Sequence, residues 1–305
     1  MRILITGGAG YKGVYLTKKL LSLGHQVAIL DNFMYGYDSV LHMVDHPELS
    51  IITQDIRSLE EKTLKDFDAV VHLAGVSGYP ACEANPHSAQ LINVDASRNL
   101  GKLLSKDQIL IYASTTSFYG KSGKICTEET PVEPVSLYGK TKYQGEQILL
   151  ERENTIALRL ATIFGLSPKM RIDLMVNDFV YKAVNERCIV LFESQSKRTF
   201  LHISDAISAY VFALDNFGVM RHGIFNVGDD SLNFSKLEIA ENIRKYTDCK
   251  IIDSDIEDFD VRNFLVSFEK LRNLGYSVSV TLDDGIKELV KLYGFYKPFT
   301  TYKTI

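Results

Sequence analysis

The chain has 305 residues, 46% of them hydrophobic, and a formal net charge of −4. This length allows a large core in one domain or two joined lobes, and the charge argues against a general nucleic-acid or anionic-membrane surface. The first apolar stretch is interrupted by glycines and no apolar run approaches membrane-spanning length, so we expect a cytoplasmic protein. The cysteines lie far apart and lack zinc or redox spacing, which predicts free thiols and no metal site: Cys82, Cys126, Cys188 and Cys249.

The start of the chain predicts a strand that runs into a glycine-rich turn. An apolar segment ends at Thr6, and glycines then recur at Gly7, Gly10 and Gly13. Gly7 permits a tight turn, Gly10 lets the backbone approach a phosphate, and Gly13 lets the next helix pack against the sheet. The free N–H groups at that helix start bind an anion. Alone, such a cluster could be an ordinary strand-to-helix turn.

The residues that follow favour a dinucleotide site over that ordinary turn. Apolar residues predict a helix that ends at Gly24, and a second strand over 26–30 leads directly to Asp31. A carboxylate there can accept both ribose hydroxyls of an adenosine and would repel the extra phosphate of NADP, so we expect NAD. Lys12, within the turn, either extends to solvent or adds charge near the pyrophosphate.

Strands and helices alternate through the first half of the sequence. Strand-like runs occur at 50–53, 68–73, 108–114 and 155–160, with a helical segment at 89–104. This order predicts an α/β protein with a Rossmann doubly wound parallel sheet and a smaller carboxyl-terminal α/β substrate lobe. We place the NAD-binding domain at 1–164 and the substrate-binding lobe at 165–305, interleaved with the first and opening with a loop over 166–171.

Tyr138 and Lys142 stand four residues apart on one face of a predicted helix, after a strand that ends near Thr115. A lysine and a cofactor cation could lower the tyrosine pKa from about 10 and make it a base. The same spacing occurs at Tyr15/Lys19, Tyr246/Lys250 and Tyr293/Lys297, which fit amphipathic helix surfaces. Because only Tyr138 follows a hydroxyl-bearing strand end, we predict that it is the catalytic tyrosine.

Together these motifs resemble an extended short-chain dehydrogenase/reductase of the NAD-dependent epimerase/dehydratase family, which acts on nucleotide sugars. The resemblance extends over nearly the whole sequence. Its motifs are Thr6-Gly7-Gly8-Ala9-Gly10-Tyr11-Lys12-Gly13, Asp31-Asn32, Asp55-Ile56, Val71-His72-Leu73-Ala74-Gly75, Asn93, Ser114-Thr115 and Tyr138-Gly139-Lys140-Thr141-Lys142. In the second half, Arg198, Asp205, Asn226-Val227-Gly228 and Arg262 also match.

The resemblance implies a role for each of these positions. Thr115, Tyr138 and Lys142 would be catalytic, and Thr115, Thr162, Arg198 and Arg262 would bind the nucleotide sugar, the arginines through its diphosphate. The NAD-binding residues would be Gly7, Gly10, Tyr11, Lys12, Gly13, Asp31, Asn32, Asp55, Ile56, Leu73, Ala74, Gly75, Asn93, Ser114, Tyr138 and Lys142. Related enzymes pair as homodimers through two helices, which here correspond to 89–104 and 138–151.

The resemblance leaves several reactions open. A 4,6-dehydratase would carry an Asp-Glu pair after the catalytic threonine, where this chain has Thr116 and Ser117, so dehydration is disfavoured. We expect a nucleotide-sugar 4-epimerase of surface polysaccharide biosynthesis, with a 4-dehydrogenase or 4-ketoreductase, such as a GDP-heptose 4-dehydrogenase, as the alternative. A protein that binds NAD without turnover is disfavoured, because a sensor does not need a poised base.

Overall fold

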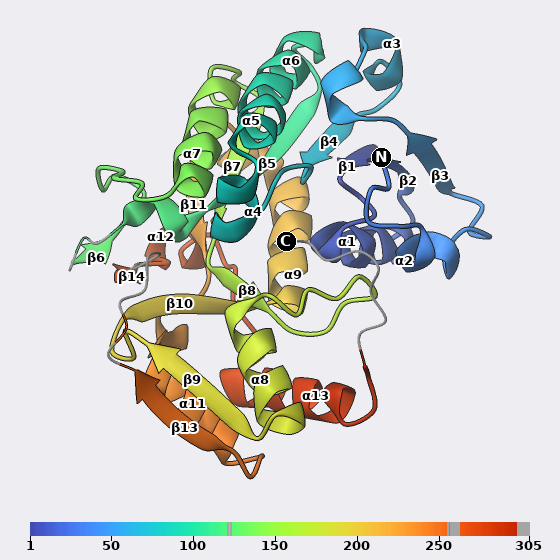
Figure 1. Cartoon of the computed structure of the whole chain (residues 1–305). Helices are drawn as coiled ribbons and strands as arrows, with labels where there is room; N and C mark the ends of the chain where they lie inside the picture. Colours follow the sequence, from blue (N-terminus) through green and yellow to red (C-terminus); the bar gives the residue numbers. More distant parts are fainter. Residues whose placement is uncertain (121, 123, 255, 257–262, 298–305) are drawn as a thin grey trace.

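A seven-stranded parallel sheet forms the upper body of the molecule (Figure 1) in the computed structural model, which describes residues 1–120, 122, 124–254, 256 and 263–297. The strand order is β11-β7-β5-β4-β1-β2-β3, and every neighbouring pair is parallel. The strands are β1 (Arg2–Thr6), β2 (Gln26–Asp31), β3 (Leu49–Thr53), β4 (Ala69–His72), β5 (Ile109–Thr115), β7 (Thr155–Leu160) and β11 (Gly223–Val227). The predicted α/β fold with a doubly wound sheet is confirmed.

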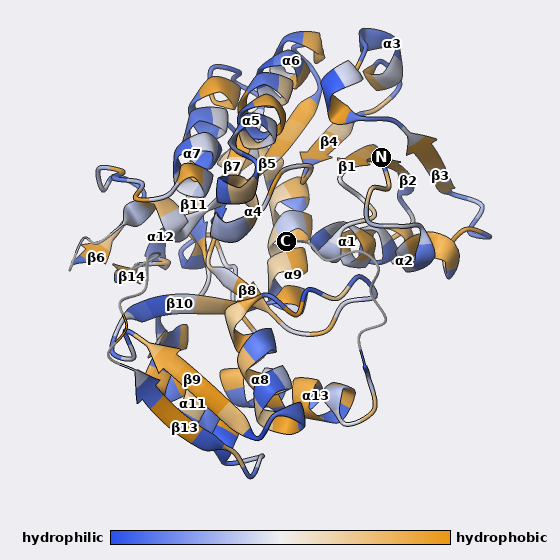
Figure 2. Cartoon of the chain, viewed as in Figure 1, coloured by the Kyte–Doolittle hydropathy of each residue, from blue (hydrophilic) through white to orange (hydrophobic). Residues whose placement is uncertain are grey.

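Helices cover both faces of this sheet. One layer contains α1 (Tyr11–Ser22) and α9 (Ile203–Asp215), and the other contains α6 (Ala96–Leu103) and α7 (Leu137–Leu149). Because successive strand residues point to opposite faces, Ile3 and Ile5 pack with the first layer and Leu4 with the second. Burial on both faces explains why the central strands are apolar along their length, as Figure 2 shows for β4 and β5.

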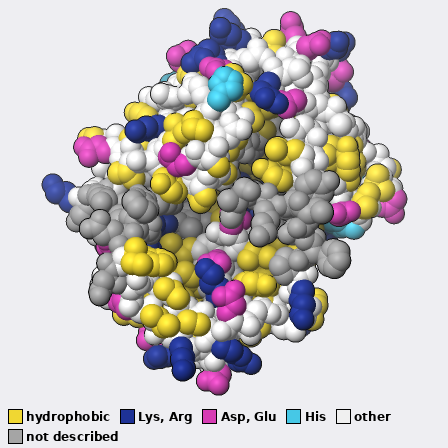
Figure 3. Space-filling view, viewed as in Figure 1, with side chains coloured by type: hydrophobic (Ala, Val, Ile, Leu, Met, Phe, Trp, Pro, Cys, Tyr) yellow, Lys and Arg dark blue, Asp and Glu magenta, His cyan; other side chains and the backbone are white. Residues whose placement is uncertain are grey.

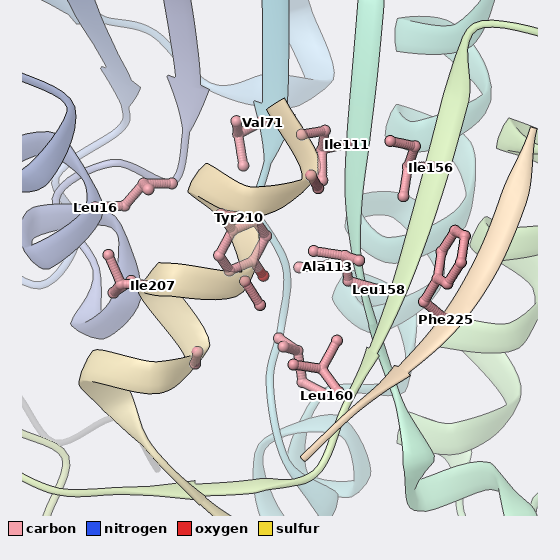
Figure 4. Packing of buried hydrophobic residues seen from close by; sticks show 14 of the residues in the cluster. Leu16, Val71, Ile111, Ala113, Ile156, Leu158, Leu160, Ile207, Tyr210 and Phe225 are labelled. Atoms are coloured by element: carbon pink, nitrogen blue, oxygen red, sulfur yellow. The ribbon is translucent and has the colours of Figure 1, made fainter. Parts of the chain in front are cut away.

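The packing beneath α9 fixes this helix against the middle of the sheet. Figure 4 shows Tyr210 and Ile207 of α9 near Leu16 of α1 and near Val71 and Ile111, which belong to neighbouring strands. Leu16, Val71 and Ile111 are fully buried. The carboxyl-terminal half of the chain therefore supplies part of the core of the nucleotide-binding body, through both α9 and the edge strand β11.

A smaller lobe lies below the large sheet in Figure 1. Strand β10 (Lys197–His202) pairs in parallel with β8 (Thr162–Phe164) and antiparallel with β12 (Asn233–Ser235), while β9 (Cys188–Phe192) pairs with β13 (Lys250–Ser254). Helices α8 (Met175–Asn185), α11 (Lys236–Arg244) and α13 (Leu282–Tyr293) pack around a second core that includes Phe164 and Phe200.

The remaining elements are short. The predicted helix over 89–104 begins earlier, as α5 (Pro86–Gln90), and continues through one π-helical turn, Leu91–Asp95, into α6. The other helices are α2 (Asp38–Leu41), α3 (Glu61–Leu64), α4 (Tyr79–Ala84), α10 (Phe217–Met220) and α12 (Glu269–Arg272), with 3-10 turns at Ile56–Ser58, Thr116–Tyr119 and Asp230–Leu232. Strands β6 (Ile125–Cys126) and β14 (Leu265–Val266) pair with each other.

The sheet has its topological switch at β1, because β2 and β3 lie on one side of it and β4, β5 and β7 on the other. In such sheets a ligand binds at the carboxyl ends of the strands beside the switch. None of the helices in the described ranges is long and apolar enough to cross a membrane. All four cysteines are free. Figure 3 shows Lys, Arg, Asp and Glu side chains interspersed around the rim of one face, without an extended basic area among its described atoms.

Candidate active site

The glycine-rich turn after β1 leaves no space for side chains. Gly7 has a φ of +70°, and a Cβ there would lie 2.7 Å from the backbone nitrogen of Ala74. A Cβ on Gly13 would lie 2.4 Å from the Gly7 carbonyl oxygen, and one on Gly10 would lie 3.2 Å from that oxygen. The close approach of backbone to backbone leaves the start of α1 as an open cradle of N–H groups, which fits a dinucleotide pyrophosphate.

Tyr11 and Lys12 point to different surroundings at the start of α1. The Tyr11 hydroxyl donates a hydrogen bond of 2.7 Å to the Gly165 carbonyl, so this side chain joins the turn to the lobe. Burial lowers the pKa of Lys12 from 10.5 to about 8, and the nearby Arg171 guanidinium contributes to this shift. Lys12 is therefore a partly buried cation beside the cradle rather than a side chain fully extended into solvent.

Asp31 lies at the tip of β2, where its carboxylate is held by the backbone. It accepts hydrogen bonds from the N–H groups of Ala9, at 3.0 Å, and Phe33, at 2.9 Å. Burial raises the pKa of Asp31, and these two bonds oppose that shift. The bond to Ala9 ties the acidic group directly to the glycine-rich turn, so the two predicted NAD contacts form one rigid unit.

The adjoining loops contribute a second, more exposed acidic group. The Asn32 side chain donates to Asp55 at 3.0 Å, and Arg57 forms an ion pair with Asp55 at 2.8 Å. The Arg57 hydrogen bonds hold the pKa of the Asp55 carboxyl well below its usual range. Ile56, which lies between Asp55 and Arg57 in the sequence, is buried. These residues lie together at the ends of β2 and β3.

The loop after β4 is fastened on both sides. The backbone nitrogens of Leu73 and Ala74 donate to Thr6, and a Cβ on Gly75 would lie 2.9 Å from the Asn93 side-chain oxygen. Asn93 also accepts from the Val76 N–H at 2.9 Å and donates to the Thr141 hydroxyl at 3.0 Å. Its side chain thus joins this loop to the helix that carries the predicted catalytic pair.

Tyr138 lies in the first turn of α7, where Ser136 caps the helix by accepting from the Gly139 N–H at 3.2 Å. The side chains of Ser77, in the loop after β4, and Thr115, at the end of β5, lie beside the Tyr138 hydroxyl. Burial raises the pKa of Tyr138, whereas these two neighbours and the Arg171 charge oppose that rise. The structure therefore brings the tyrosine and the predicted threonine together.

Lys142 follows one helical turn later and is 6% exposed. Its Nζ lies 4.0 Å from the centre of the Tyr112 ring, in a cation–π arrangement. Burial and the charge of Lys12 hold the pKa of Lys142 well below its usual range, while Glu146 opposes the shift. Lys12 lies close enough to Arg171 and to Lys142 for their positive charges to repel each other. An anionic ligand bound between them would relieve this repulsion.

The three hydroxyl residues at the end of β5 have different partners. Thr115 accepts from the Ser117 N–H at 3.1 Å and donates to the Ser117 hydroxyl at 2.9 Å, and it lies beside Tyr138. Ser114 instead donates to Glu146 at 2.5 Å, and Thr116 donates to the Leu160 carbonyl at 3.3 Å. Because Ser114 and Thr116 turn toward other buried groups, Thr115 is the hydroxyl of this strand end that faces the tyrosine.

Comparison with known proteins agrees with this geometry. Residues 3–228 match the model of the "NAD dependent epimerase/dehydratase family". The chain belongs to the NAD-dependent epimerase/dehydratase family. This family is one of NAD-dependent enzymes, so NAD is the cofactor. Its extended short-chain dehydrogenase/reductase members include nucleotide-sugar epimerases, decarboxylases and dehydratases.

Curated relatives span several of these activities. A putative UDP-glucose 4-epimerase of Methanocaldococcus jannaschii is 27% identical over 306 residues, covering 94% of this chain and 97% of the relative. UDP-glucuronate 4-epimerase 5 of Arabidopsis thaliana is 28% identical, with 97% and 76% covered. UDP-glucuronic acid decarboxylase 1 of the same plant is 28% identical over 81% of this chain, which spans 59% of that relative.

Solved structures share the fold. The UDP-glucuronic acid 4-epimerase of Bacillus cereus, in complex with UDP-glucuronic acid and NAD, has a TM-score of 0.86 and 23% identity, covering 96% of this chain and 99% of that one. The UDP-glucose 4-epimerase of Thermus thermophilus in complex with NAD has a TM-score of 0.83 and 22% identity, covering 97% and 99%.

Two residues that the sequence did not predict lie near the predicted catalytic pair. Ser77 lies beside the Tyr138 hydroxyl, and Arg171 influences the pKa of both Tyr138 and Lys12. Ser77 follows the strand β4, and polar residues in loops after parallel strands lie at the same edge of the sheet, so its position in the sequence could have predicted it. No sequence pattern predicts Arg171, because a long loop brings it to the site.

A third missed residue, Glu146, lies two helical turns after Tyr138 on the same face of α7. It forms a buried ion pair with Arg159 of β7 at 2.7 Å, with side chains 0% and 3% exposed. Arg159 also donates to the Tyr119 hydroxyl at 2.8 Å. This network fixes α7, and hence Tyr138 and Lys142, against β5 and β7. The spacing 138, 142, 146 is the sequence signal that could have identified Glu146.

The predicted substrate residues of the lobe lie on the sheet formed by β8 and β10. Thr162 is opposite Phe200 in the parallel register, and Arg198 comes two residues before Phe200, so Thr162 and Arg198 share a sheet face. Arg198 is buried. Arg262 lies outside the described residues. Within the described part of the chain, no cluster of three or more His, Cys, Asp or Glu side chains could hold a metal.

Proposed function

We propose that the protein is an NAD-dependent nucleotide-sugar 4-epimerase. The observation that carries this proposal is that Tyr138, at the start of α7, lies beside Thr115 at the end of β5, with Lys142 one turn away and the glycine-rich cradle following β1 in the same sheet. A base, a hydroxyl that orients the reacting oxygen and a dinucleotide site are the parts that reversible oxidation of a sugar alcohol needs.

In the proposed reaction Tyr138 removes the proton from the sugar C4 hydroxyl, and Thr115 donates a hydrogen bond to the same oxygen. NAD, held by the residues that follow β1, β2 and β4, would supply reversible hydride transfer at C4, so that the ketone could be reduced from its other face. Lys142 would stabilise the phenolate through its positive charge and hold the nicotinamide ribose. Tyr138 then returns its proton to the oxygen at C4, which completes a redox-neutral inversion.

The residues proposed to hold NAD follow the strand ends. The turn from Gly7 to Gly13 would bind the pyrophosphate, with Lys12 supplying charge, and Asp31 would accept the adenosine ribose hydroxyls. Asn32, Asp55 and Ile56 would line the adenine, while residues 73–75 and Asn93 would shape the groove toward the nicotinamide. Because the Ser114 hydroxyl donates to Glu146, Ser114 would contact NAD through its backbone.

Two features support inversion over dehydration. Thr116 and Ser117 stand at the positions of the dehydratase acid and base, and the Thr116 hydroxyl is already donated to the Leu160 carbonyl. The archaeal relative described as a putative UDP-glucose 4-epimerase matches along 94% of this chain. A 4-dehydrogenase or 4-ketoreductase uses the same tyrosine, threonine and lysine, so it stays the second candidate.

We propose a UDP-linked hexose or hexuronate as the first substrate to test. The names of the similar proteins given above each contain a UDP-sugar. Arg198 would contact the diphosphate and Thr162 the sugar, since they share a face of the lobe sheet. Arg262 is proposed as a second phosphate ligand by resemblance. The product would supply surface polysaccharide synthesis in the cytoplasm.

The deciding experiment incubates purified protein with UDP-, GDP-, CDP- and dTDP-linked hexoses, hexuronates and heptoses, and follows product stereochemistry, CO2 and NADH absorbance. Inversion at C4 without net NADH supports the proposal. A 4-keto product with stoichiometric NADH would establish the dehydrogenase instead, and CO2 release from a uronate would establish a decarboxylase. Tyr138→Phe serves as the matched inactive control.

A homodimer is proposed through α6 and α7, whose exposed sides meet along a groove. Gln90, Arg98, Gln144 and Gln147 line it together with the partly buried Tyr143. Light scattering on the purified protein measures this directly, and a monomeric mass at micromolar concentration would contradict it. Tyr143→Glu would add a charge to the interface and should shift the mass toward that of a monomer.

A further inference from the structure

The segment Gly165–Arg171, called the strap below, crosses the loops that follow β1, β2 and β4. Its first contacts are with Tyr11 at the start of α1. The Tyr11 hydroxyl donates to the Gly165 carbonyl at 2.7 Å, and the Ser167 hydroxyl donates to the Tyr11 carbonyl at 2.7 Å. Both bonds are buried, and Ser167 is 2% exposed. The strap is therefore bonded directly to the first turn of the helix that closes the glycine-rich cradle.

The two long side chains of the strap reach the loops on either side of that cradle. Lys169 donates from Nζ to the carbonyl of Tyr35, in the loop after β2. Arg171 reaches the Ser77 carbonyl, in the loop after β4, at 3.5 Å, and forms an ion pair with Asp173. The strap contacts thus extend from the adenosine end of the predicted NAD groove to the loop after β4, in which Ser77 lies beside Tyr138.

The strap is held in this shape by one buried amide. Asn177 of α8, which is 0% exposed, accepts from the Gly165 N–H at 3.0 Å and donates to the Arg171 carbonyl at 2.8 Å. These bonds close the ends of the strap onto each other, and Lys169 gains a further bond from its N–H to the Ser167 hydroxyl at 3.2 Å. A loop with this many internal bonds is ordered before any ligand arrives.

The charges at the strap suit the path of a dinucleotide. Lys169 lies near the carboxylates of Asp31 and Asp38, whose charges oppose the lowering of the Lys169 pKa by burial. Arg171 lies near Lys12 and Tyr138. An extended NAD bound from Asp31, past the cradle, to Tyr138 would run beneath the strap along its whole length.

We propose that the strap is an NAD clamp, in which Lys169 is a cofactor-binding residue that fastens the strap over the adenosine ribose, so that NAD stays bound between turnovers. The inference rests on the NAD dependence of the family and not on which sugar is converted. Release of NAD requires the Lys169 and Ser167 bonds to break, whereas a strap that only connects β8 to α8 would leave NAD exchange unaffected.

The test measures NAD retention without any sugar. Protein purified in NAD-free buffer is denatured, and the NAD released per chain is quantified. Exchange of bound NAD for isotopically labelled NAD is then timed. We expect nearly one NAD per wild-type chain and slow exchange. Lys169→Met should exchange at least about tenfold faster, because it removes a charged donor but keeps the aliphatic stem, and Lys169→Arg should restore most of the retention.

Lys106→Met is the matched control, because Lys106 is exposed just before β5, at the opposite end of the sheet. Ser167→Ala is the second variant and should also accelerate exchange. Thermal unfolding of each variant identifies those that fold. Wild-type protein that loses NAD during gel filtration, or folded Lys169→Met and Ser167→Ala proteins that exchange NAD at the wild-type rate, would overturn the proposal. Slow exchange in a protein that inverts no sugar would refute only the epimerase.

Discussion

Of the four places where a lysine follows a tyrosine by four residues, two lie in opposite surroundings. Tyr138, partly buried, and Lys142, buried, share a helix face at the end of β5. Tyr246 lies in a turn after α11, and Lys250 begins the exposed strand β13. The Tyr246 hydroxyl bonds the exposed Asp283, which raises the tyrosine pKa. Spacing alone therefore selects candidates, whereas burial against a strand end beside another hydroxyl makes one of them a candidate base.

Lysines in the two regions differ in the same way. Lys287, beside Tyr246, lies 3.4 Å from Asp283, and the hydrogen bond to that carboxylate raises its pKa. Burial lowers the pKa of Lys12 to about 8, and Arg171 contributes to the shift. Water and a nearby acid favour the protonated form of a surface lysine, whereas an anion entering the groove would favour the protonated forms of Lys12 and Lys142.

The largest difference between the two regions should appear when the tyrosine hydroxyl of each is removed. Tyr138→Phe should lower kcat by roughly 10²–10⁴-fold, because it removes the proton acceptor, while NAD binding stays nearly intact. Tyr246→Phe should leave kcat unchanged. Steady-state assays and NAD titration of both variants check this, and an active Tyr138→Phe enzyme would exclude the tyrosine as the base.

The next largest effect should be on folding. Glu146→Gln keeps the shape of the side chain but leaves Arg159 buried without its anionic partner, so the free energy of unfolding should fall by about 3–5 kcal/mol. Asp283→Asn, in the exposed region, should leave the melting temperature unchanged. Urea unfolding followed by circular dichroism gives both values, and equal stabilities would show that the buried pair is replaceable.

The preference for NAD over NADP should depend on Asp31 and not on Asp283. Asp31→Ala should weaken NAD binding by about 10- to 100-fold and NADP binding less, because it removes the ribose acceptor together with the charge that repels the extra phosphate. Asp283→Ala should change neither affinity. Calorimetric titration with both dinucleotides measures the preference, and an unaltered ratio for Asp31→Ala would disprove its assigned contact.

The smallest predicted effect is a pH dependence. Protonated Lys12 favours the pyrophosphate, so NAD affinity should fall as the pH rises past about 8, by at most about tenfold per pH unit. Lys12→Met should lose this part of the slope. Without NAD the sign reverses for folding: between pH 8 and 10.5 the unfolded chain holds more protons on this lysine than the native state, so stability contributed by Lys12 rises with pH. Titrations across this interval test both statements.

The sequence by itself determined the sheet, its nucleotide-binding end and the predicted catalytic tyrosine. Glycines at 7, 10 and 13, the acid at 31 and apolar runs of strand length are local signals, because backbone crowding and burial on two faces restrict the residues at each position. The Tyr138–Lys142 pair was found since i, i+4 residues share a helix face.

Only the tertiary structure decided which other groups meet this site. Ser77, Glu146 and Arg171 come from different elements, and Asn177 joins the two ends of the strap through bonds to the Gly165 N–H and the Arg171 carbonyl. Tyr11 was predicted as a cofactor contact, yet its hydroxyl bonds the lobe. Contacts between residues this far apart in sequence depend on how the whole chain packs, and no periodic pattern in one segment encodes them.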